Sequence, residues 1–142
     1  MNVGNLIKSV GALVCGLAVG MCVNMALIQL NMTVLYPMPA GVDMNDPVAF
    51  GAFIQGLPAQ AFALVLVAHL GQSFVGAWIA ARLAPTRPML LAMVIGALSL
   101  LGGILAMTMI PGPAWLAVEL PLYLVVAWLA GRREVQRRAL RP

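Results

Sequence analysis

Charged residues are scarce in this sequence, and their scarcity excludes most classes of soluble protein. Only 8% of the 142 residues are charged, whereas 63% are hydrophobic. A soluble domain usually carries about 25% charged and about 45–50% apolar residues, and this composition would expose large apolar patches in water. We therefore expect an integral membrane protein that forms one transmembrane domain, without room for a separate soluble domain.

The sequence also lacks the residues from which metal, haem and redox sites are built. It has a single histidine, His69, and no cluster of metal ligands accompanies it. The two cysteines, Cys15 and Cys22, would lie about 10 Å apart along one helix, which is too far for a disulfide. No serine has an evident base, and no phosphate-binding loop is present. We expect no metal and no cofactor, and no motif ties the chain to a known family.

Long apolar runs are what the sequence has in abundance. At ~1.5 Å per residue, each is long enough to cross a hydrocarbon core of ~30 Å. A chain that crosses lipid in such runs has to satisfy its backbone polar groups internally, so each run should be helical. The predicted fold is all-α, an integral membrane four-transmembrane-helix bundle. Its spans are predicted at about 5–30, 57–82, 88–110 and 113–131.

The basic residues predict the orientation of these spans. Lys8 precedes the first span, Arg82 and Arg87 separate the second from the third, and five arginines occupy the tail at 132–142. The other two connections contain none, so the positive-inside rule places both termini in the cytoplasm. The tail should extend the fourth helix.

The Ala-, Leu- and Arg-rich composition points to a bacterial cytoplasmic (inner) membrane. Because the basic residues flank the spans, we expect the lipid bilayer as a partner and no nucleic acid.

The connection at 31–56 should contain a short helix at the outer surface. Asp46 and Pro47 are typical of the N-cap and first position of a helix. A helix from there to Arg82 would be about 54 Å long, so a break is expected near Gly56 and Pro58. The apolar residues that follow Pro47 fall on one helical face, namely Phe50, Phe53, Ile54 and Leu57.

Small residues recur at helical spacing and predict close helix packing. In lipid, glycines let helix backbones approach one another. The predicted packing positions are Gly16, Gly20, Gly76, Gly96, Gly102 and Gly103. The first span has a further small-residue face, formed by Gly11, Cys15, Ala18 and Cys22. This spacing suits contacts within one chain and contacts between copies equally.

Two ionisable residues, His69 and Glu119, fall inside the predicted spans, where lipid makes them costly. One interpretation is a proton or solute path with Asp43 and Asp46 at its outer mouth. The residues along that path would be Glu119, His69, Asn24, Gln60 and Gln72. The other interpretation is structural, with His69 bonded to a neighbouring helix and Glu119 protonated or paired with the Asn24 amide. A depth offset of about 9 Å is expected between His69 and Glu119.

These features leave three functions open. The first is a protein that acts through helix–helix contacts, as a self-assembling bundle or an accessory subunit, with copies of itself or other membrane subunits as partners. The second is an oligomeric transporter or channel that uses Glu119 and His69. The third is a membrane enzyme with an outer acidic site at Asp43 and Asp46, which the lack of a catalytic residue set disfavours.

Overall fold

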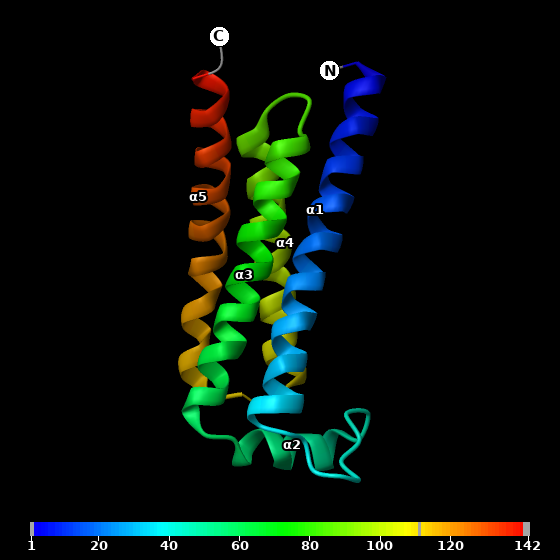
Figure 1. Ribbon diagram of the computed structural model, residues 1–142, viewed down its shortest axis with the longest axis vertical. Helices are drawn as coiled ribbons and strands as arrows, with labels where there is room; N and C mark the ends of the chain where they lie inside the picture. Colours follow the sequence, from blue (N-terminus) through cyan, green and yellow to red (C-terminus); the bar gives the residue numbers. More distant parts are fainter. Residues whose placement is uncertain (1, 111, 141–142) are drawn as a thin grey trace.

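Helices account for most of the chain that the computed structural model describes, which is residues 2–110 and 112–140, and no strand occurs in these ranges. Four helical segments are long and apolar enough to cross a membrane. They lie side by side, with the short helix α2 across one end (Figure 1). In chain order the elements are α1 (Val3–Leu30), the π-helix η1 (Asn31–Leu35), α2 (Pro47–Gly56), α3 (Ala59–Leu83), α4 (Pro88–Met109), the 3-10 helix η2 (Ala114–Val118) and α5 (Glu119–Ala139).

The short helix α2 begins where the sequence predicts. The Asp46 carboxylate accepts hydrogen bonds from the backbone N–H groups of Val48 and Ala49, at 2.9 and 3.2 Å. Pro47 occupies the first helical turn, and the backbone is extended at Leu57 and Pro58 after the helix ends. The predicted start of this helix and the break before the second long helix are therefore confirmed.

The first and last long helices extend beyond their predicted ends. Helical winding continues from α1 through Asn31–Leu35, where the sequence predicts a loop. Asn31 is buried there and donates a hydrogen bond to the carbonyl of Ala61 at 3.2 Å, which fastens this end of α1 to α3. At the other end of the chain, α5 runs past the predicted limit of the span at 131 to Ala139, as expected of a helical tail. Arg141, one of the five arginines of the tail, lies outside the described residues.

Glycine and alanine hold the long helices in close contact towards the end of the bundle that carries both termini (Figure 1). Gly16 and Gly20 of α1 lie against Gly76 and Gln72 of α3, and a Cβ added at Gly16 would sit 2.5 Å from the Gly76 carbonyl oxygen. Gly96 of α4 lies equally close to α5. The buried core beside these glycines consists mainly of alanine: Ala12, Ala77, Ala80, Ala81, Ala84, Leu91, Ala92, Ile95, Ala127 and Ala130.

Two of the predicted packing glycines differ from each other although they are adjacent. A Cβ on Gly103 would lie 2.6 Å from the Tyr123 ring of α5. Gly102 is exposed, and a Cβ there would meet no atom within 4 Å. Gly102 therefore makes no close helix contact within this chain, because consecutive residues on a helix point about 100° apart.

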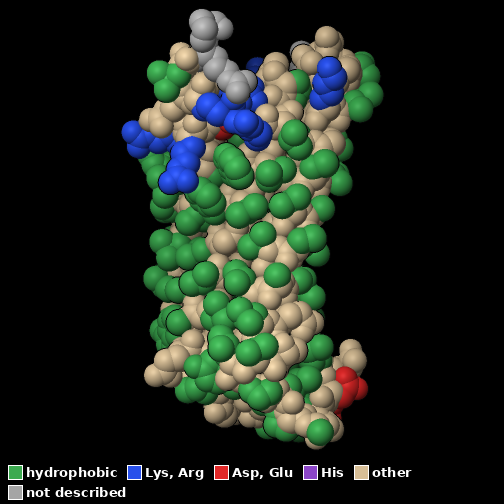
Figure 2. Space-filling view, in the orientation of Figure 1, with side chains coloured by type: hydrophobic (Ala, Val, Ile, Leu, Met, Phe, Trp, Pro, Cys, Tyr) green, Lys and Arg blue, Asp and Glu red, His purple; other side chains and the backbone are tan. Residues whose placement is uncertain are grey.

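The two ends of the molecule carry opposite charge. Both termini and the α3–α4 connection lie at one end, which we call the terminal end, and α2 lies at the other, which we call the α2 end (Figure 1). Lys and Arg side chains gather at the terminal end, whereas acidic side chains are visible near α2 (Figure 2). Asp43 and Asp46 belong to the connection that precedes α2. Exposed charge at the terminal end is thus mainly basic.

Candidate functional site

A cavity of about 500 Å³ lies at the α2 end, between α2 and the long helices. Its walls are largely apolar and include Phe50, Ile54 and Phe62. Among the described residues that line it, only His69 and Glu119 have polar side chains. Such a volume falls in the range of ~300–1,000 Å³ that small-molecule pockets occupy, and few polar groups on an apolar wall are typical of them.

His69 and Glu119 form a direct pair in the wall of this large cavity. His69 Nδ1 and Glu119 Oε2 are 2.9 Å apart. Glu119 is 2% exposed, while the His69 side chain keeps 23% of its surface accessible. The polar wall of the cavity is therefore one buried carboxyl group held by one imidazole, which is its only ion-pair partner among the described residues.

The contact between His69 and Glu119 contradicts the depth offset of about 9 Å expected from the sequence. Two features of the backbone explain the difference. Helix α3 begins at Ala59 instead of Leu57, which places His69 nearer the α2 end. The residues before Glu119 form the 3-10 helix η2, which rises about 2.0 Å per residue instead of 1.5 Å and carries Glu119 deeper. The remaining offset of about 5 Å is spanned by the two side chains.

Proline accounts for the irregular start of α5. Pro121 has no N–H group, so the Ala117 carbonyl, four residues earlier, lacks its α-helical donor. The backbone here takes 3-10 geometry from Ala114 to Val118, and the N–H of Glu119 donates to the carbonyls of Ala117 and Leu116. The proline therefore fixes the depth at which the carboxyl group of Glu119 meets His69.

A second, more polar cavity of about 240 Å³ lies on the other side of His69. Asn24 of α1 and Gln72 of α3 line it, and the Asn24 amide donates to Gln72 Oε1 at 2.6 Å. The predicted alternative in which Asn24 pairs with Glu119 is therefore wrong. Tyr123, one turn beyond Glu119, also lines this polar cavity, and its phenol lies near the Glu119 carboxyl group. His69 lines both cavities and stands between them.

The other predicted site residues lie apart from this pair. Gln60 is exposed on the first turn of α3 and lines neither the large nor the polar cavity. Asp43 is exposed, and its Oδ1 accepts from the backbone and side-chain amides of Asn45 at 2.8 and 2.9 Å. Asp46 caps α2. The two aspartates predicted at the outer mouth therefore make local contacts and do not line the large cavity.

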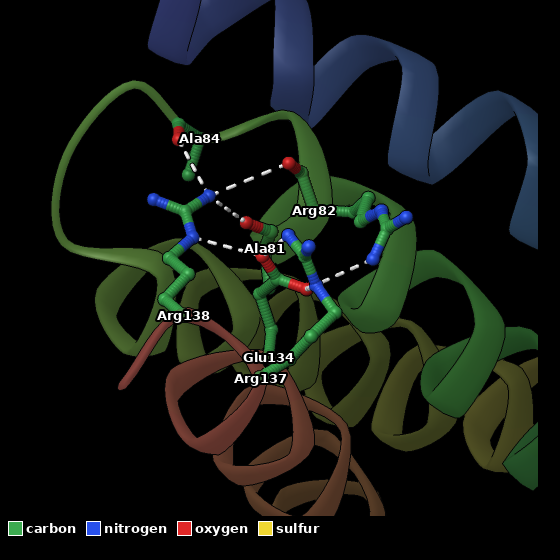
Figure 3. Close-up of polar contacts among 6 residues, drawn as sticks. All are labelled: Ala81, Arg82, Ala84, Glu134, Arg137 and Arg138. Carbon is green, nitrogen blue, oxygen red and sulfur yellow. Dashed lines mark hydrogen bonds and ion pairs between the residues drawn. The ribbon is translucent and has the colours of Figure 1, made fainter. Parts of the chain in front are cut away.

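A second buried carboxylate, which sequence reasoning missed, lies at the terminal end. Glu134 is 1% exposed and bonds to Arg137 and to Arg138, with Arg82 at 3.6 Å (Figure 3). The same Arg138 donates to the carbonyls of Ala81 and Ala84 at 2.9 and 2.8 Å, where α3 ends. We call this group the Glu134 cluster, and it fastens the tail of α5 to the end of α3. The spacing of Glu134 to the two arginines, i+3 and i+4, predicts the pairing but not the burial.

Comparison with family models, with curated proteins and with solved structures finds no match for this chain. Its function has to be inferred from the residues and their geometry.

Proposed function

We propose that the chain is a four-span protein of the bacterial cytoplasmic membrane, with both termini in the cytoplasm, that binds a small and largely apolar molecule in the large cavity and carries it across the membrane. The observation that carries this proposal is the buried pair of His69 and Glu119, at 2.9 Å, in the wall of a cavity of about 500 Å³. Ionisable groups inside a membrane span are costly, so their presence favours a function.

The placement of charge supports the proposed orientation. The basic residues gather at the terminal end, as the positive-inside rule expects of a cytoplasmic surface (Figure 2). The α2 end has no lysine or arginine in either of its connections. Helix α2 packs Phe50 and Ile54 onto Phe62 and Leu116, while Val48 is exposed on it. An apolar helix across the ends of the spans suits the outer membrane interface.

The contrast between the two halves of the bundle favours binding over simple packing. Towards the terminal end, this same chain fills its interior with glycine and alanine so closely that an added Cβ would collide. At the α2 end it encloses a large cavity and places a carboxyl group in its wall. A chain that needed only helix contacts could continue the small-residue packing, which is the efficient way to join helices in lipid.

The position of the cavities favours a carrier over an open channel. The large cavity ends at the His69–Glu119 pair, and beyond the polar cavity the helices close on Gly16, Gly76 and Ile95. This close packing towards the terminal end is what an open channel through the bundle would have to lack. A carrier has to bind its substrate from one side while the other is shut.

Native mass spectrometry of the full chain, released gently from bacterial membranes, tests the binding proposal. Ala106 lines the large cavity, so Ala106→Phe should fill it, whereas Ala97→Phe on the exposed face of α4 should not. We expect a small molecule bound to the wild-type chain and to Ala97→Phe, and lost from Ala106→Phe. Identical bound masses in all three proteins would contradict the proposal.

Transport is tested separately by reconstitution into liposomes with the molecule so identified. We expect the double variant Glu119→Gln with His69→Ala to lose most of its flux, because both polar groups of the cavity wall are replaced. Ala97→Phe serves as the control that should retain flux. Full flux through the double variant would leave the chain a binding protein and not a carrier.

A second candidate function, assembly with copies of itself or with other membrane subunits, is favoured by one face of α1. Gly11, Cys15, Ala18 and Cys22 are exposed there, while the opposite face packs Gly16 and Gly20 on α3. Small residues on an exposed face leave room for another helix to approach closely.

The native cysteines make this second function testable. Oxidative cross-linking in native membranes should yield a covalent dimer through Cys15 or Cys22, and none in the variant with both replaced by serine. A matched control adds Leu101→Cys, on the exposed face of α4, to that serine variant. Cross-linking only through Leu101→Cys, or a chain that always purifies alone as a monomer, would contradict assembly through α1.

A further inference from the structure

Formal charge at the α2 end is entirely acidic apart from His69. The sequence has no lysine or arginine between Lys8 and Arg82, and none between Arg87 and Arg132. Asp43 and Asp46 lie in the connection that leads to α2, and Glu119 lies in the cavity wall. Asp43 and Asp46 do not line the cavity, but together with Glu119 they leave this end with acidic groups and no fixed positive charge, a balance that favours cations over anions.

Few titratable groups face Glu119 in the part of the chain that the structure describes. His69 of α3 contacts it, and Tyr123 on its own helix lies one turn away. Helices α2 and α4 contain no titratable side chain. On α1, apart from Lys8 at the terminal end, only Cys15 and Cys22 can titrate, and both are exposed on a different face. The charge of the site is thus set by the protons that His69 and Glu119 hold between them.

The net charge of this pair depends on a single proton. When neutral His69 donates its Nδ1–H to the Glu119 carboxylate, the pair carries one negative charge. The imidazole Nε2 and the second carboxylate oxygen are then both hydrogen-bond acceptors. When one more proton binds, the pair becomes neutral overall. A site that alternates between these two states suits a ligand that brings a positive charge and hydrogen-bond donors.

We infer that the large cavity takes an organic cation with an apolar body, such as a protonated amine, and that a proton competes with it for the His69–Glu119 pair. This inference rests on the proposed binding function of the cavity. An ammonium group would donate to the carboxylate oxygen that His69 leaves free, and the apolar body would lie against Phe50 and Phe62. Binding converts the protonated pair and the cation into the cation-bound pair and one free proton, so mass and charge balance.

Competition of this kind couples the two ligands reciprocally. If the cation lowers the affinity of the pair for a proton, the proton lowers the affinity for the cation by the same factor. Such a carrier would load the cation where protons are scarce and release it where they are abundant. An anionic ligand would be repelled by the unprotonated pair, and a neutral one would gain less because it lacks a charge-assisted hydrogen bond.

Three compounds with the same apolar body test the inference: 4-phenylbutylamine, 4-phenylbutan-1-ol and 4-phenylbutyrate. Their binding to the full chain in nanodiscs is measured by calorimetry at pH 8 and pH 5, with empty nanodiscs as the baseline. At pH 8 we expect the amine to bind about 10-fold or more tightly than the alcohol, which is what a charge-assisted hydrogen bond contributes. At pH 5 the preference should shrink, and the amine should release protons as it binds at intermediate pH.

Variants assign the preference to Glu119. Glu119→Gln should bind the amine and the alcohol with similar affinity at both pH values, because the negative charge is gone. Asp43→Asn removes an exposed carboxylate outside the cavity wall and should change the preference less than about 2-fold, since solvent and salt screen its charge. The wild-type pH dependence needs no variant, so the test holds even where Glu119→Gln lowers stability.

The possible failures are distinguishable. Equal binding of amine and alcohol by the wild-type chain at both pH values overturns the cation inference and leaves the binding function intact. Tighter binding of 4-phenylbutyrate than of the amine also overturns it. No binding of any compound beyond that of empty nanodiscs overturns both the inference and the proposed function.

Discussion

Helix α5 carries two buried glutamates that differ in almost every respect except burial. Glu119 and Glu134 are 2% and 1% exposed, and they lie about 22 Å apart along the same helix. Glu119 has one imidazole as its ion-pair partner and a cavity beside it. Glu134 bonds to two guanidinium groups, has a third nearby, and sits where helices are closely packed.

The two glutamates differ in whether the positive charge beside them is permanent. Arginine stays protonated throughout the range in which proteins function, so Glu134 remains an ionised carboxylate with permanent counter-charges. An imidazole can be neutral or protonated, so Glu119 has no permanent counter-charge beside it. The Glu134 cluster therefore stabilises the contact between α5 and α3. The His69–Glu119 pair has the properties of a binding site whose charge can change.

Disrupting the Glu134 cluster should have the largest effect on stability. Glu134→Ala leaves the arginines without their shared acceptor and loosens the attachment of the α5 tail to the end of α3. Breaking a buried ion pair typically costs about 3–5 kcal/mol, and the partly exposed arginines place this one near about 3 kcal/mol. Thermal or denaturant unfolding followed by circular dichroism in detergent measures it.

Gln136→Ala, two residues away and exposed, is the control for Glu134→Ala and should unfold like the wild-type chain. An unchanged unfolding midpoint in Glu134→Ala would mean that the cluster forms on the surface without holding the two helices together.

Adding a methyl group between α1 and α3 should have the next largest effect on stability. Gly16→Ala places a methyl group 2.5 Å from the Gly76 carbonyl oxygen, which is backbone and cannot turn aside. Such overpacking typically costs about 1–3 kcal/mol. Gly102→Ala adds the same atoms where no neighbour lies within 4 Å, and because alanine favours a helix interior over glycine it should not lower the unfolding midpoint. Equal stability of the two variants would show that the helices are looser than this contact implies.

The sequence predicts the features of this molecule that depend on short stretches of chain. The start of α2 depends on Asp46 and Pro47 alone, which are adjacent, and it is confirmed. The number of long apolar helices depends on hydrophobicity within each run, and the structure has four helices long and apolar enough to span a membrane. Both predictions succeed because the residues that determine them are neighbours in the sequence.

The contact between His69 and Glu119 depends on structure that composition does not reveal. Their depths differ from the expectation because η2 winds as a 3-10 helix and α3 starts at Ala59. Pro121 is a signal for the first of these changes, but its consequence for depth requires the backbone geometry. The second requires the position of α2, since that helix determines where the chain enters α3.

The burial of Glu134 was missed for a different reason. The arginines around it follow the positive-inside pattern, which explains them by topology alone. Their second role depends on the end of α3, whose carbonyls at Ala81 and Ala84 accept from Arg138. A partner more than fifty residues away in the sequence cannot be recognised from the local charge pattern.

A local effect at the α2 end should be smaller than either change in the packed half. Asp46→Ala removes the N-cap of α2, which typically costs about 1 kcal/mol. Because α2 attaches to the bundle mainly through side chains such as Phe50 and Ile54, the loss should appear as faster amide hydrogen exchange within Pro47–Gly56. The exchange of α3 and α5 should not change. Gln55→Ala, on the same helix, is the control.

The smallest effect on stability is expected where the proposed function is most affected. Glu119→Gln keeps an oxygen that can accept from His69 and removes a charge that is costly to bury, so the unfolding free energy should change by less than about 1 kcal/mol. Circular dichroism under the conditions used for Glu134→Ala measures it.

A loss of unfolding free energy as large as that of Glu134→Ala would mean that both glutamates mainly stabilise the fold, and the distinction between them would fail. A small change in stability, together with lost binding in the large cavity, is what separates a residue kept for its chemistry from one kept for the fold.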